Sequence, residues 1–188
     1  MHTVNEYREK ATVLDAVLLD RTLTRLAHQI MEHQRHADQV VLIGIRNRGD
    51  VLAKRLAAII SRMEGISVPS GALDITRHRD DLQKSEVRSQ KSELKTSSIP
   101  CSLADCTVIL IDDVLFTGRS VRAALDALLE FGRPAKIQLA VLIDRGHREY
   151  PIRADYVGKN IPTSLREDVM VKLKEVDGED KVIIREAL

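Results

Sequence analysis

The sequence predicts an α/β protein with a doubly wound, mainly parallel central sheet flanked by helices. Three mostly apolar runs, 40–45, 108–111 and 137–143, are typical of strands buried on both faces, as central parallel strands are. Amphipathic helical patterns follow the first two runs, over about 51–63 and 121–128. Alternation of strand and helix in this order builds a parallel sheet with helices on its faces.

Composition limits the size and class of the protein. The 188 residues suit one domain, so we expect a single domain over 1–188. Lys and Arg total 29 against 28 Asp and Glu, so the overall charge gives no sign of a nucleic-acid partner. Trp is absent and aromatic residues are scarce, which argues against a base-stacking surface for single-stranded RNA.

Two features favour the cytoplasm as the location of the protein. Cys101 and Cys106 are too few and too poorly patterned for a disulfide framework or a zinc site, which favours a reducing compartment. No apolar run reaches the length of a membrane span, and the N-terminus does not resemble a signal peptide. We therefore expect a cytoplasmic protein with no membrane partner.

The N-terminal part predicts a polar segment followed by a long helix. Residues 1 to about 12 are polar, and we expect a loose arm or a short edge segment there. From about 15 to 36, apolar residues recur on one arc of a helix. The opposite arc carries Arg21, Thr24, Arg25, His28 and Arg35. Taken alone, such a polar face is more often solvated surface than a binding surface.

A polar turn follows the first predicted strand, 40–45. Arg48 and Gly49 there place a guanidinium and backbone N–H groups at the start of a helix, and both suit a diphosphate. As a bare pattern this signal is weak. Because the carboxyl ends of parallel strands lie at one edge of a sheet, the turn should lie near the end of the strand 108–111.

The most specific stretch of the sequence is 108–120. The strand is predicted to end at Asp112 and Asp113, and a turn over 117–120 leads into the next helix. Backbone N–H groups and hydroxyls of that turn suit a phosphate, while the two acids suit sugar hydroxyls or a divalent cation. Together they predict a ribose-phosphate site. The alternative is that the two acids are a helix cap and a solvated neighbour, which is common in doubly wound proteins.

A polar insert lies between these two site-forming segments. Residues 77–98 are rich in Lys, Arg, Glu, Gln and Ser and show little apolar periodicity. We expect a flexible lid that closes over substrate, with plain disorder or a short β-hairpin as alternatives.

The C-terminal third predicts a polar strand end and a hairpin. The strand 137–143 ends in a polar cluster over 144–148, and a short strand and turn are expected over 154–164. Two further strands, 169–173 and 181–184, are separated by Asp177-Gly178, a hairpin signal that predicts a small C-terminal β hood.

These motifs together resemble a known family. The stretch 108–120 is similar to the motif by which type I phosphoribosyltransferases bind 5-phosphoribosyl-1-diphosphate (PRPP). Nearly the whole chain from about residue 18 resembles the bacterial pyrimidine operon attenuation regulators with uracil phosphoribosyltransferase activity. The segments that carry this resemblance are 23–25, 74–76, 79–82, 132–134, 137–149 and 158–164. Members of that family bind leader RNA of the pyrimidine operon when uridine nucleotides are abundant, and many convert uracil and PRPP to UMP and diphosphate.

The resemblance implies a site for PRPP and uracil. Asp112, Asp113 and Arg48 would be the catalytic residues, with Mg²⁺ arriving with PRPP rather than on an identified protein ligand. The implied substrate-binding set is Asn47, Arg48, Gly49, Asp112, Asp113, Val114, Leu115, Phe116, Thr117, Gly118, Arg119, Ser120, Arg145, Lys159, Asn160 and Ile161.

The resemblance also implies partners. The leader RNA would contact Thr24, Arg25, His28, His147, Arg148, Arg153 and Lys159. The implied small-molecule partners are uracil, PRPP, UMP and other uridine nucleotides, and the implied assembly is a homodimer or a larger homo-oligomer.

Three positions depart from the family pattern. Asn47 stands where Thr is common, Arg77-His78 stands where Leu-Tyr is common, and His33 stands where Arg is frequent. The departures at Asn47 and Arg77-His78 bear on catalysis more than on ligand binding, which leaves a regulator that has lost catalysis as one alternative. A pyrimidine salvage phosphoribosyltransferase without RNA regulation is a second, separate alternative.

Overall fold

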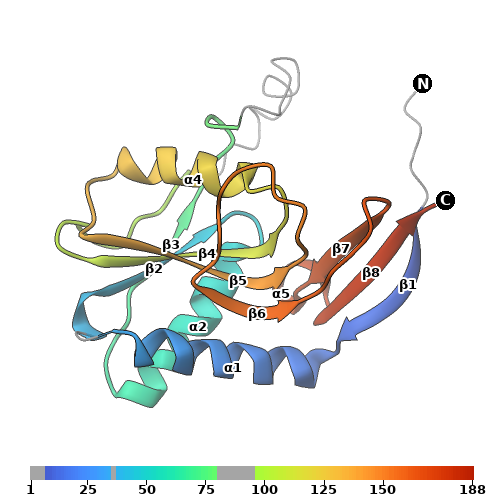
Figure 1. Ribbon diagram of the computed structural model, residues 1–188. Helices are drawn as coiled ribbons and strands as arrows, with labels where there is room; N and C mark the ends of the chain where they lie inside the picture. Colours follow the sequence, from blue (N-terminus) through green and yellow to red (C-terminus); the bar gives the residue numbers. More distant parts are fainter. Residues whose placement is uncertain (1–6, 35–36, 80–95) are drawn as a thin grey trace.

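The computed structural model describes residues 7–34, 37–79 and 96–188 (Figure 1). Most of the predicted lid, 77–98, and Arg35 of the predicted polar helix face lie outside the described residues. None of the described helices is long and apolar enough to cross a membrane.

A five-stranded parallel sheet forms the centre of the molecule, in the order β3-β2-β4-β5-β6. Its strands are β2 (Val40–Ile45), β3 (Ser70–Leu73), β4 (Thr107–Leu115), β5 (Lys136–Asp144) and β6 (Tyr156–Asn160). The predicted fold class is confirmed, because the apolar runs form the three central strands.

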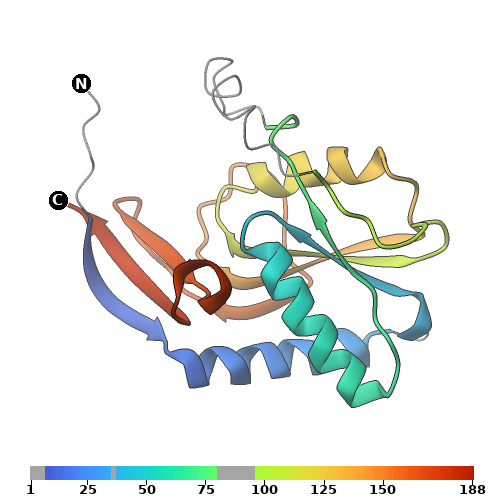
Figure 2. The same cartoon turned by 180° about the vertical axis from the view of Figure 1, so that it is seen from behind.

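Helices cover both faces of this sheet (Figures 1 and 2). Helices α1 (Ala16–Glu32) and α2 (Gly49–Glu64) pack on one face, and α4 (Arg119–Leu129) packs on the other. Successive side chains of a strand point to opposite faces. Ile109 of β4 therefore lies in the core beneath α1 and α2, and Leu110 lies in the core beneath α4.

A smaller antiparallel sheet, the hood, joins both ends of the described chain (Figure 1). It contains β1 (Tyr7–Leu14), β7 (Glu167–Lys172) and β8 (Lys181–Ala187) in the order β1-β8-β7. The predicted hairpin is present, but a one-turn helix, α5 (Lys174–Asp177), lies in its connection. The predicted N-terminal arm becomes the edge strand β1 from Tyr7 onward, because it pairs with β8.

One strand end differs from the prediction. We expected β4 to stop at Asp112 and Asp113, but it continues to Leu115. The reason is that the β4 backbone stays paired with β5 through Val114 and Leu115, opposite Ile143 and Asp144. The two acids therefore lie within a strand rather than at a helix cap, which excludes the cap alternative for them.

Candidate functional site

The carboxyl ends of β2, β4, β5 and β6 bring four predicted segments to one edge of the sheet. These segments are 46–49, 112–120, 144–149 and 159–161. This edge is where ligands bind in open α/β sheets, because strand ends and helix starts meet there.

The two acids of β4 are held in a low-dielectric environment. Asp112 is only 8% exposed, and Asp113 beside it is half-buried. Burial, with the neighbouring charge of Asp113, raises the pKa of Asp112 well above its ordinary value. Burial also raises the pKa of Asp113, against the opposing effects of the Val114 N–H group and the Arg48 charge. Buried carboxyls of this kind are good acceptors for sugar hydroxyls.

A cavity of about 320 Å³ joins Asp112 to the turn that begins α4. Its other lining residues are Arg79, Val114, Leu115, Phe116, Thr117, Gly118, Arg119, Ser120 and Val121. The first turn of a helix leaves backbone N–H groups unbonded and carries the positive end of the helix dipole. Asp112 and the turn 117–120, which we call the phosphate turn after its predicted ligand, thus line one cavity with room for a small ligand.

Gly118 is required by the shape of this turn. Its φ of 93° lies in the left-handed region, and an added Cβ would lie 3.3 Å from Cβ of Tyr150. Glycine adopts this backbone conformation without steric penalty. Arg79 and Val121 are the cavity residues that we did not predict as site residues. Arg79 stands in a segment, 79–82, that carried the family resemblance.

The turn between β2 and α2 lies directly against the end of β4. A Cβ on Gly49 would lie 2.4 Å from the Ile111 carbonyl oxygen, so only glycine permits this approach. The Arg46–Asn47 peptide bond in the turn is cis, and Asn47 is exposed. Close packing of this turn brings Arg48 near enough to Asp113 to affect its ionisation.

Arg48 already has a partner in the hood. Its Nη2 donates to Oδ1 of Asp177 at 2.7 Å, and its Nε donates to Oδ2 of the same carboxylate at 3.3 Å. The predicted diphosphate arginine is therefore held by the turn that contains α5.

Arg145 is buried between β5 and the hood. Its Nε donates to Oγ1 of Thr163 and its Nη1 to Oδ1 of Asp168, both at 3.1 Å, and it also donates to the Glu167 carbonyl. The guanidinium lies 4.1 Å from the ring centroid of Phe116. Arg145 thus links the hood to the phosphate turn. Of the remaining predicted base-binding residues, Lys159 and Asn160 are exposed and Ile161 is buried.

The segment after β5 wraps around the phosphate turn. The Thr117 carbonyl accepts hydrogen bonds from the Glu149 and Tyr150 N–H groups at 2.9 and 3.0 Å. Arg148 donates to the carbonyls of Phe116 at 2.8 Å and of Ile152 at 3.0 Å, and it also pairs with Asp144. The position of the phosphate turn is therefore tied to the segment 144–152.

Comparison with known proteins identifies the family. Residues 11–174 match the phosphoribosyl transferase domain family. A bifunctional protein PyrR from Pelotomaculum thermopropionicum is 55% identical over 179 residues, which is 95% of this chain and 97% of the relative. A bifunctional protein PyrR from Deinococcus radiodurans is 57% identical over 173 residues, which is 92% of this chain and 93% of the relative. The chain belongs to the PyrR family of phosphoribosyltransferases.

Solved phosphoribosyltransferases share the fold of this PyrR-family chain. A hypoxanthine-guanine phosphoribosyltransferase from Bacillus anthracis superposes with a TM-score of 0.69 at 18% identity, covering 96% of this chain and 99% of that one. The hypoxanthine phosphoribosyltransferase of Trypanosoma cruzi, in complex with the product IMP, superposes with a TM-score of 0.69 at 16% identity, covering 96% of this chain and 93% of that one. At these identities the likeness concerns the fold alone.

The predicted RNA-binding residues differ in how far their side chains are exposed. Helix α1 lies beside β6 (Figure 1), and Arg25 donates to the Gly158 carbonyl, next to Lys159. The exposed members are Arg25, His28, His147, Arg153 and Lys159. Thr24 is half-buried, and its hydroxyl donates to the Asp20 carbonyl at 3.0 Å. Arg148 is half-buried, and its guanidinium is bonded to the Phe116 and Ile152 carbonyls and to Asp144.

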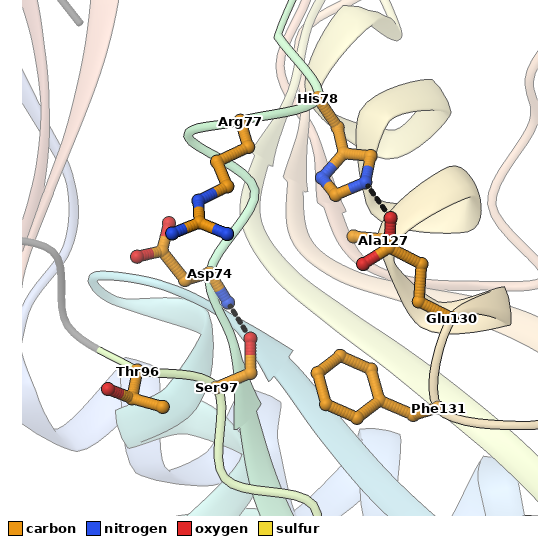
Figure 3. A pocket seen from close by; sticks show the side chains of 8 residues that line it. All are labelled: Asp74, Arg77, His78, Thr96, Ser97, Ala127, Glu130 and Phe131. Atoms are coloured by element: carbon orange, nitrogen blue, oxygen red, sulfur yellow. Dashed lines mark hydrogen bonds and ion pairs between the residues drawn. The ribbon is translucent and has the colours of Figure 1, made fainter.

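A second cavity, of about 220 Å³, lies at the base of the insert (Figure 3). Arg77 and His78, two positions that depart from the family pattern, line it together with the end of α4. His78 Nε2 lies 2.9 Å from Oε1 of Glu130, and the Ser97 hydroxyl accepts from the Asp74 N–H at 2.9 Å (Figure 3). The described base of the insert is therefore fastened to α4.

In the described ranges, no three His, Cys, Asp or Glu side chains gather into a metal-binding group. Asp112 and Asp113 do provide carboxylate oxygens at one place, and such oxygens suit Mg²⁺ carried by a phosphorylated substrate.

Proposed function

We propose that the chain binds the leader RNA of the pyrimidine operon in response to uridine nucleotides and also converts uracil and PRPP to UMP and diphosphate. The observation that carries this proposal is the single cavity in which Asp112 meets the turn 117–120. Relatives described as bifunctional, at 55% identity and above, support two activities on one chain.

In the proposed reaction the two acids of β4 bind the ribose. Asp112 and Asp113 accept hydrogen bonds from the ribose hydroxyls, and the turn 117–120 holds the 5′-phosphate at the start of α4. Displacement of diphosphate by uracil develops positive charge on the ribose. The two carboxylates stabilise that charge, which lowers the barrier without a strong general base.

The leaving group is assigned to the turn between β2 and α2. Arg48 binds the diphosphate with its guanidinium, and Gly49 contributes its N–H group. Mg²⁺, when bound with PRPP, supplies further neutralisation of the diphosphate charge. Asn47 lies in the same turn and is exposed to the ligand side of the sheet edge in this assignment.

The uracil is assigned to the strand end at 159–161. Lys159 and Asn160 are exposed there, and the Ile161 N–H bonds the Asp144 carbonyl at 2.8 Å, which fixes the segment. Arg145 contributes by holding Phe116, since its donors are bonded to Thr163 and Asp168.

The RNA surface is assigned to α1, β6 and the segment 144–153. Exposed cations there contact RNA phosphates, so affinity should fall steeply with salt. Loops and bulges of the leader RNA are the expected targets, since they expose bases that A-form grooves hide. Among the predicted residues, Thr24, Arg25, His28, His147, Arg153 and Lys159 are assigned to direct contact, and Arg148 to support of the phosphate turn. A paired surface in a cytoplasmic homodimer or larger oligomer would fit such an RNA.

Filter binding of leader RNA at fixed salt, with and without UMP, tests the regulatory activity. Binding should tighten with UMP and weaken in Lys159→Gln, whereas a scrambled RNA should bind weakly in all cases. Absence of specific binding with or without UMP contradicts the regulatory proposal.

UMP formation from uracil and PRPP tests the catalytic activity. Rapid turnover without specific RNA binding would identify a salvage enzyme. Specific RNA binding that responds to UMP, without detectable turnover, would identify a regulator that has lost catalysis.

A further inference from the structure

The hood contains a carboxylate that faces the phosphoribosyl site. Asp177, the last residue of α5, forms a two-point ion pair with Arg48 across the boundary between hood and sheet. Its Oδ2 also accepts a hydrogen bond from the Leu173 N–H at 2.9 Å, which fixes the carboxylate within the hood. Burial opposes ionisation of Asp177, but the bonds from Arg48 and Leu173 outweigh it and lower its pKa. The carboxylate is therefore charged at neutral pH.

The geometry of the pair leaves part of the guanidinium available. Arg presents five N–H donors in a rigid plane, and Asp177 occupies the edge formed by Nε and Nη2. Within the described part of the chain, no hydrogen bond is made by Nη1 of Arg48. The outer edge of the same plane can therefore bind a second anion while Asp177 keeps the first edge.

From this geometry we propose that Asp177 is a positioning residue for phosphoribosyl transfer, holding Arg48 so that its outer edge meets the diphosphate of PRPP. The inference rests on the proposed role of Arg48. A free Arg side chain has many rotamers, and fixing one before the ligand arrives lowers the entropy cost of binding. The hood thus contributes to PRPP binding without touching it.

A second ion-pair group provides an internal comparison. Arg55, further along α2, bonds Glu175 and Asp180 of the same hood turn, with Nη1 at 3.1 Å from Oδ2 of Asp180. Both groups fasten the hood to the start or body of α2, and the charge of Arg48 also acts on Asp113 of the site. A role limited to fastening the hood predicts equal effects from breaking either pair.

The test compares Asp177→Asn and Asp177→Ala with the matched controls Asp180→Asn and Asp180→Ala, since Asp180 forms the corresponding two-point pair with Arg55. We expect kcat/KM for PRPP to fall about tenfold or more in Asp177→Ala and less in Asp177→Asn, since a misplaced binding group costs rate. KM for uracil should stay unchanged, and the Asp180 variants should leave both constants unchanged. Equal losses in the Asp177 and Asp180 variants, or a change in KM for uracil alone, would overturn the proposal.

A double-mutant cycle with Arg48→Met, which removes the cation, separates this inference from the proposed function. If Asp177 acts through Arg48, adding Asp177→Asn to Arg48→Met should change kcat/KM for PRPP by less than twofold. Full additivity would overturn the positioning role while leaving the diphosphate role of Arg48 intact. An Arg48→Met variant with unchanged use of PRPP would instead reject the proposed role of Arg48, and the inference with it.

Discussion

Asp112 is a buried carboxyl group, and burial disfavours its charged form. Burial raises its pKa, so the folded state keeps its proton to a higher pH than the unfolded chain does. The stability contributed by that proton is complete below the unfolded pKa and is lost as pH rises through the folded pKa. Above the folded pKa, the charge on Asp112 is therefore maintained at the expense of folding stability.

Asp112→Asn should raise the free energy of unfolding by about 1 kcal/mol at pH 8 and abolish the use of PRPP. The amide cannot ionise, so the buried charge and its cost disappear together. Urea denaturation at pH 8 and pH 5 measures the effect, and the gain should be smaller at pH 5. The exposed Asp38→Asn serves as control, and a gain independent of pH would contradict the explanation.

Arg148 shows how a predicted contact residue can have a structural role. Arg148→Ala should lower the free energy of unfolding by about 2 kcal/mol, because the Phe116 and Ile152 carbonyls lose their donor. His28→Ala, at an exposed position of α1, should change it by less than about 0.5 kcal/mol. Chemical denaturation compares the two variants. Similar stabilities would mean that the Arg148 bonds contribute little to the fold.

At the scale of elements, the approach of the β2–α2 turn to β4 depends on one missing side chain. Gly49→Ala should destabilise the fold by about 3 kcal/mol and weaken PRPP binding, because its Cβ would meet the Ile111 carbonyl oxygen. Gly65→Ala, at the other end of α2, meets no atom within 4 Å and should cost only about 1 kcal/mol for its left-handed backbone. Thermal unfolding and PRPP titration distinguish the two, and equal losses would contradict the steric argument.

Elements with strong hydrophobic periodicity could be predicted from the sequence. The run 40–45 coincides with β2, and the helix predicted from about 15 to 36 contains α1. For β1 the sequence left a loose arm and a short edge segment as alternatives, because its residues are polar and mostly exposed. Pairing with β8 decides for the edge strand. The end of β4 was predicted too early, because acidic residues interrupt the apolar pattern while backbone pairing with β5 continues.

The candidate site was predictable only in part for a related reason. Strand ends of a parallel sheet meet at one edge, so Gly49, Asp112 and Thr117 could be placed together in advance. The partners of Arg48 and Arg145 could not be predicted. They are Asp177 and Asp168 of the hood, and no local sequence pattern indicates how the hood packs against the sheet. The family resemblance named the site residues without giving these contacts.

At the scale of the whole molecule, the proposed phosphate turn and the proposed RNA surface share the segment 144–152. Thr117 is bonded to Glu149 and Tyr150, and Arg148 joins that segment to the Phe116 carbonyl. A nucleotide that shifts the turn can therefore shift the exposed His147 and Arg153 as well. This physical connection is what a nucleotide-responsive RNA surface requires.

If UMP tightens RNA binding by some factor, RNA must tighten UMP binding by the same factor, which we expect to be about tenfold. Titration calorimetry of UMP with and without saturating leader RNA measures the second factor, and filter binding gives the first. A scrambled RNA should leave UMP affinity unchanged. A UMP affinity that leader RNA leaves unchanged would contradict the coupling.

The pairing of β1 with β8 also sets the order in which a newly made chain can complete its fold. On the ribosome, β8 is synthesised after every other described element, so Tyr7 has no partner until Ala187 has emerged. The parallel sheet, which needs nothing beyond β6, can already have formed by then. Because Asp177 belongs to the hood, Arg48 gains its partner only at this late stage. Under the proposed role of Asp177, incomplete chains would fold their core before Arg48 is held in place for PRPP.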